Sequence, residues 1–64
     1  NGGNNRYTEF IRNTIAGMLI YRSMYDIQFN NIERAKKYIE KVRIEFPEVN
    51  IPNNLIQEIN KASN

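Results

Sequence analysis

Residues 31–47, with the sequence NIERAKKYIEKVRIEFP, constrain the fold of this chain more than any other stretch. Five apolar residues recur there at spacings of three and four: Ile32, Ala35, Ile39, Val42 and Phe46. This spacing places them on one stripe of an α-helix, and the opposite face is charged. Pro47 ends the helix, because proline lacks a backbone donor and keeps the preceding residue out of the helical conformation. The stretch therefore predicts a helix that buries one face.

Two asparagines mark the start of this helix. Asn30 as the N-cap places Glu33 at the spacing of a capping box, and Asn31 is the alternative cap. Because so few residues connect this helix to the one before it, we expect the two helices to form an antiparallel hairpin. A single long, bent helix is the alternative.

The segment before the asparagines predicts a long helix from about Thr8 to about Gln28. Its large apolar side chains form a broad stripe: Ile11, Ile15, Met18, Leu19, Tyr25 and Phe29, widened by Tyr7, Phe10 and Tyr21. Ala16, Ile20 and Ile27 lie on the opposite side. So much apolar circumference has two interpretations. Either neighbouring helices cover all of it, or a second apolar face is left for a partner.

After a linker at residues 48–52, the sequence predicts a short third helix from Asn53 to about Ala62. Leu55, Ile56 and Ile59 are expected to face inward, with Val49 and Ile51 sealing the end of the core. The apolar period is helical throughout, so no strands are expected.

The predicted fold is all-α, with a long helix, a second helix and a short third helix. These helices form an antiparallel three-helix bundle or a hairpin with a short third helix. We expect residues 1–6 to be a flexible linker, residues 7–62 a single helical domain, and residues 63–64 a frayed end.

Composition narrows the possible functions. The 64 residues include no Cys and no His, which excludes disulfides, the usual zinc sites, thiolate nucleophiles and imidazole bases. We therefore expect no enzyme activity, no cofactor and no metal. The longest apolar run, residues 15–21, is too short to cross a bilayer, which takes about 20 residues. Without cysteines or a signal-peptide pattern, an intracellular location, cytoplasmic or nuclear, is expected.

The second helix resembles part of a known repeat. Ala35, Ile39, Val42 and Pro47 stand at offsets 0, +4, +7 and +12. The tetratricopeptide repeat places Ala, an aromatic residue, Ala and Pro at those offsets in its second helix. Residues 30–47 are therefore similar to the second half of such a repeat. The resemblance implies that the small Ala35 side chain lets two helices approach closely.

The first half of that repeat is matched less well. It carries a Trp-Leu-Gly-Tyr pattern, and the corresponding positions here hold Leu19, Arg22, Ser23 and Asp26. A long first helix paired with a similar second helix also resembles the microtubule-interacting and transport domain. That family binds short helical tails of partner proteins in a groove between helices.

The leading hypothesis is a non-catalytic protein-protein interaction module, an adaptor-like domain that dimerises or docks onto a helix of a larger assembly. The predicted contact residues are Ala16, Ile20, Tyr21, Met24 and Ile27. Met adapts to irregular contacts, and Tyr is frequent at binding hot spots. The partner is expected to be another protein or a second copy of the chain.

The alternative hypothesis is a small helical nucleic-acid-binding domain. It would use the basic residues of the second helix: Arg34, Lys36, Lys37, Lys41 and Arg43. Acidic residues share that helix and the net charge is only +2, so a solvated charged face explains the pattern as well. Arg22 and Asp26, one turn apart, are interpreted as a structural ion pair at the edge of the apolar stripe.

Overall fold

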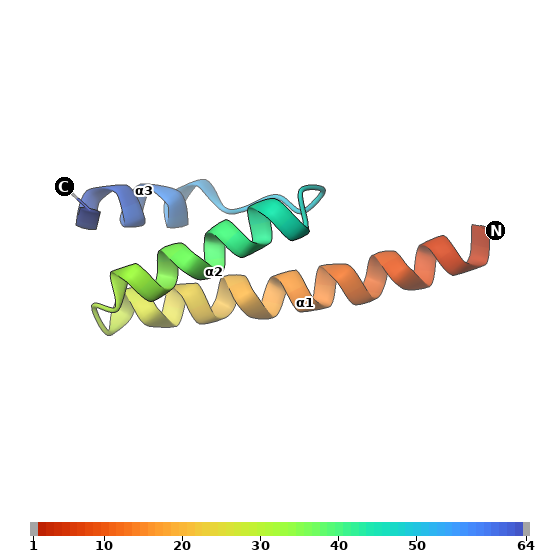
Figure 1. Ribbon diagram of the computed structural model, residues 1–64, viewed down its shortest axis with the longest axis horizontal. Helices are drawn as coiled ribbons and strands as arrows, with labels where there is room; N and C mark the ends of the chain where they lie inside the picture. The colour runs from red at the N-terminus through yellow and green to blue at the C-terminus, as the bar shows by residue number, and fades with distance from the viewer. Residues whose placement is uncertain (1, 64) are drawn as a thin grey trace.

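The computed structural model describes the backbone of residues 2–63 and the side chains of residues 6–62. It contains helices α1 (Gly2–Gln28), α2 (Ile32–Glu45) and α3 (Asn53–Ser63), and no strand occurs within this range. Helix α2 runs antiparallel to α1, and α3 runs antiparallel to α2 (Figure 1). The predicted all-α fold with a long, a second and a short third helix is confirmed.

Helix α1 begins earlier than the sequence predicts. It starts at Gly2 and not near Thr8, so it includes most of the segment that we expected to be a linker. Extending a helix by one residue costs much less than starting one, and no proline blocks the extension. At the other end of the chain, Ser63 closes α3, and the expected fraying of Asn64 lies outside the described residues. The N-terminal part of α1 consequently extends past the end of α2 (Figure 1).

The turn between α1 and α2 is a Schellman motif. Asn30 adopts a left-handed conformation with φ 64°. The Asn30 N–H donates to the Ile27 carbonyl at 3.0 Å, and the Asn31 N–H donates to the Asp26 carbonyl at 2.7 Å. Asparagine is one of the few residues besides glycine that adopt this conformation readily. Asn30 therefore ends α1, and it is not the N-cap of a capping box.

Helix α2 starts from Asn31, which makes no side-chain capping bond, and ends where Pro47 follows Phe46. The Phe46 N–H still donates to the Val42 carbonyl at 2.8 Å. At the start of α3, the Pro52 carbonyl accepts from the N–H groups of Leu55 and Ile56. The end of α2 and the start of α3 therefore lie beside Pro47 and Pro52, as the sequence predicts.

The core lies between the three helices in two adjoining clusters. One contains Ala35, Ile39, Leu55 and Ile59, and the other contains Ala16, Val42 and Phe46. Half-buried Ile20 and Ile51 pack against both clusters, Ile27 packs against the first, and Leu19 and Val49 pack against the second. The predicted inward faces of α2 and α3 are thus the faces that the structure buries.

Helices α1 and α2 approach closely because small residues line their contact. Ala16, Ser23 and Ala35 have no exposed surface. The Ser23 hydroxyl donates to the Ala35 carbonyl at 3.2 Å, which satisfies this buried polar group. The close approach that Ala35 predicted therefore occurs, opposite Ser23 and not opposite a bulky side chain.

An arginine holds the linker after α2 against α1. The Arg12 guanidinium makes a two-pronged ion pair with the Glu48 carboxylate, at 2.6 Å from Nε to Oε2 and 3.1 Å from Nη2 to Oε1. Arg12 also donates to the Glu45 carbonyl and lies 4.7 Å above the centre of the Phe46 ring. One side chain thus bonds to both sides of the turn at Pro47.

Candidate interaction surface on helix α1

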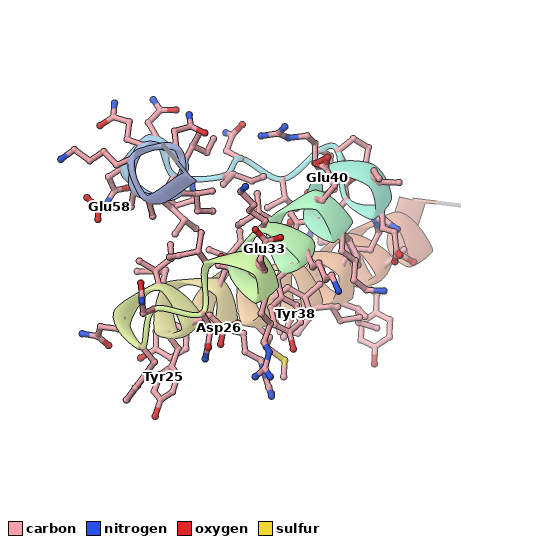
Figure 2. All side chains as sticks on the ribbon, turned by 60° about the vertical axis from the view of Figure 1, so that its left-hand side comes forward. Tyr25, Asp26, Glu33, Tyr38, Glu40 and Glu58 are labelled. Carbon is pink, nitrogen blue, oxygen red and sulfur yellow. The ribbon has the colours of Figure 1, made fainter. Side chains whose placement is uncertain are left out.

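The side of α1 that faces away from α2 and α3 carries most of the large exposed apolar side chains of the described chain. We call this set the outer face: Tyr7, Phe10, Ile11, Ile15, Met18, Tyr21, Met24, Tyr25 and Phe29. Tyr21 is 74% exposed and Met18 is 65% exposed. Helices α2 and α3 lie on the same side of α1 (Figure 1), and the Tyr25 side chain points away from both of them (Figure 2).

The outer face is organised along one line of positions. Positions at alternating spacings of four and three follow it along the helix: Tyr7, Ile11, Thr14, Met18, Tyr21, Tyr25 and Gln28. We call this line the seam. Its mean spacing is 3.5 residues, the period at which helices pack side by side in coiled coils. Five of its seven residues are large and apolar or aromatic, and none is charged.

The polar Thr14 on the seam is already satisfied within its own helix. Its hydroxyl donates to the Phe10 carbonyl at 2.8 Å. A second body that covers Thr14 would therefore leave no unpaired hydroxyl donor beneath it. Burial of the seam at Thr14 therefore does not carry the free-energy cost of an unsatisfied hydroxyl donor.

Gly17 lies beside the seam, two turns from both Met24 and Phe10 on the surface of the helix. A methyl group added to Gly17 would meet nothing within 4 Å. Glycine inside a helix costs roughly 0.5–1 kcal/mol relative to alanine. Packing within this chain does not require glycine at this position. Because Gly17 has no side chain, the outer face is shallower there than at its neighbours.

The five predicted partner contacts divide between the two sides of α1. Tyr21 and Met24 belong to the outer face. Ala16 is fully buried against Val42 and Phe46, while Ile20 and Ile27 are half-buried against the core. The prediction that Ala16 is accessible to a partner is wrong, because α2 packs directly on it. The broad stripe of α1 is the exposed side, apart from Leu19, which is half-buried against the core.

A hollow of about 350 Å³ lies at the C-terminal end of the outer face. It is lined by three aromatic residues, by side chains of both positive and negative charge, and by one asparagine: Tyr21, Arg22, Tyr25, Asp26, Phe29, Asn31 and Arg34. The rings of Tyr25 and Phe29 are 4.7 Å apart. Asp26 is only 6% exposed, and its Oδ2 has no hydrogen-bond partner. The expected ion pair with Arg22 does not form, since the Arg22 guanidinium lies 5.9 Å from the centre of the Tyr38 ring.

The basic residues of α2 are largely matched by carboxylates of the same helix. Lys36 lies 3.9 Å from Glu33, Lys41 lies 3.1 Å from Glu45, and Arg43 lies 3.8 Å from Glu40. Lys36, Lys37 and Arg43 line a groove of about 350 Å³ between α2 and α3, together with Glu33 and Glu40. Arg34 lies apart from them, at the hollow beside α1. This mixture of charges gives α2 no continuous positive face for phosphates.

The Arg12–Glu48 pair is the main electrostatic feature near α1. The hydrogen bond from Arg12 lowers the pKa of the Glu48 carboxyl below its ordinary value of 4.5. The same bond raises the pKa of Arg12 above its ordinary value. Both side chains are partly exposed, and they lie on the α2 side of α1. The pair therefore contributes to the fold and not to the outer face.

No protein-family model, curated protein or solved structure matches this chain. The likeness of residues 30–47 to a tetratricopeptide repeat, and of the long first helix to the microtubule-interacting and transport domain, therefore stays a prediction. Among the described helices, none combines the length and apolar character needed to cross a membrane.

Proposed function

We propose that this chain is a protein-protein interaction module that binds an apolar helix along the outer face of α1. The observation that carries the proposal is an uncharged seam with coiled-coil spacing on the uncovered side of a 27-residue helix. Monomeric proteins rarely expose apolar patches larger than a few hundred Å². The exposed apolar area of nine large side chains on one side of a helix is larger than such a patch, which favours a binding role.

A helical partner suits this surface better than a flat or extended one. The outer face follows the length of α1 and has no sheet edge to which a strand could add. Two helices that pack lengthwise bury such a stripe continuously, with side chains of one filling the spaces between side chains of the other. The tyrosines on the seam are the residues that we expect to dominate the binding energy.

Site-specific photocrosslinking tests this proposal. A benzophenone amino acid replaces Met18 on the outer face or, as the matched control, Ile44, which is 72% exposed on α2. In the cells of origin, we expect the Met18 position to capture a defined protein, identified by mass spectrometry, and the Ile44 position not to capture it. Equal capture at both positions, or none at Met18, would refute the proposal.

A further inference from the structure

We infer that the helix bound by the outer face is the outer face of a second copy of this chain, so that two α1 helices pack lengthwise along their seams. This inference rests on the proposed function and names its partner. The geometry of the seam, its charge and its area each bear on the identity of the partner.

The area is sufficient for a stable dimer. The five aromatic side chains of the outer face are 59–74% exposed, and at roughly 150–250 Å² each they expose on the order of 600 Å². The two methionines and two isoleucines, 39–65% exposed, bring the total to the order of 1,000 Å². A standard stable interface buries about 800 Å² on each partner. A second outer face is therefore large enough to cover the first without any contribution from α2 or α3.

The seam is complementary to itself. From Tyr7 to Gln28 it spans about three heptads, the length over which a coiled-coil pattern is meaningful. Two copies of an uncharged seam bring no like charges together, although each chain has a net charge of +2. Arg22 is the charged residue at the edge of the seam, and it is drawn toward the Tyr38 ring on α2. The seven seam positions themselves therefore bring no charged side chain into the contact between two copies.

Two further features favour close contact between copies. Gly17 has open space above it, so a side chain of the second copy can settle against the backbone beside the seam. Helices α2 and α3 lie on the other side of α1 in both views, so they do not block the approach of a second α1 (Figures 1 and 2). The whole described length of the seam is accessible.

Sedimentation equilibrium on the complete chain tests the inference. Runs between about 1 and 300 µM bracket a dissociation constant in the micromolar range, and a tighter dimer has twice the monomer mass at every concentration in the range. We expect the wild-type mass to rise to twice 7.6 kDa across this range. Met18→Glu places two carboxylates in each dimer interface and is expected to weaken dimerisation by about 100-fold or more. The control Ile44→Glu is expected to change the dissociation constant by less than about twofold.

Circular dichroism checks that each variant folds. Met18 is 65% exposed, so a carboxylate there stays hydrated in the monomer. If Met18→Glu loses helicity, Tyr21→Glu on the same seam takes its place. A wild-type chain that stays monomeric throughout, or a dimer that outer-face variants leave intact, would overturn the inference. A monomeric chain whose Met18 photocrosslinks to a different protein would overturn only the inference and would leave the proposed function standing.

Discussion

The two sides of α1 differ in both side-chain size and coverage. The inner side, at Ala16 and Ser23, is made of small residues that α2 covers completely. The outer face is made of aromatic residues, methionines and isoleucines that no helix covers within the described chain. A bundle interior usually takes the larger side chains. Helix α1 thus packs its smallest residues closest to α2 and leaves its largest apolar side chains exposed within the described chain, where we propose that they serve association.

The largest expected difference in the free energy of unfolding is between an isoleucine of the core and an isoleucine of the outer face. Ile39→Ala in the core is expected to lower the free energy of unfolding by about 2–4 kcal/mol, because it removes buried methylenes and leaves a cavity. Ile15→Ala on the outer face is expected to cost less than about 1 kcal/mol in dilute solution, since Ile15 is 43% exposed. Urea denaturation measures both. Equal losses would show that the outer face is part of the core.

Ala16→Leu tests the inner side of α1 directly. The added side chain has no space where α2 packs, so the free energy of unfolding is expected to fall by about 1–3 kcal/mol. Thermal denaturation followed by circular dichroism measures the change. A leucine that is tolerated without loss would mean that α1 and α2 do not approach as closely as the structure describes.

Gly17→Ala, one residue further along, is expected to raise the free energy of unfolding, whereas Ala16→Leu lowers it. Alanine favours the helix by roughly 0.5–1 kcal/mol relative to glycine, and its methyl group meets nothing in the same chain. The melting temperature in dilute solution should therefore rise. A decrease would place Gly17 against a neighbour within its own chain.

The Arg12–Glu48 pair predicts the smallest effect, a dependence of stability on pH. The pKa of Glu48 is lower in the folded chain than its ordinary value of 4.5. Its contribution to stability is therefore complete above that value and is lost as the pH falls through the lower folded-state pKa. Glu48→Gln should remove this part of the acid sensitivity. Urea midpoints of the wild type and the variant, compared above and below about pH 4.5, should differ more at the higher pH.

The sequence predicted the helices well, because their ends depend on local chemistry. Pro47 ends α2 whatever the rest of the chain does, and Asn30 and Asn31 lie at the turn. Of the two N-caps that the sequence offered, Asn30 was wrong and Asn31 stands at that position, since a capping box and a left-handed C-terminal asparagine both favour the same residue type. Hydrogen bonds to carbonyls of α1 decide between the two arrangements.

The sequence did not predict which side of α1 faces the core. Helical periodicity identifies apolar faces, but it does not say which face a neighbouring helix covers. The sequence therefore left open whether neighbouring helices cover all of the apolar surface of this helix or leave one face for a partner. The signal that was missed is the run of small residues on the other side, Ala16 and Ser23, whose size matches Ala35 on α2. Close helix packing requires small residues on both partners, and this requirement outweighed hydrophobicity alone.

The melting temperature measured as a function of protein concentration shows whether the outer face serves association and not folding. For the wild type we expect it to rise with concentration, because dimerisation stabilises the folded state. For Met18→Glu we expect it to stay at the dilute wild-type value at every concentration. A wild-type melting temperature independent of concentration, or a variant that melts well below the wild type even in dilute solution, would contradict the account.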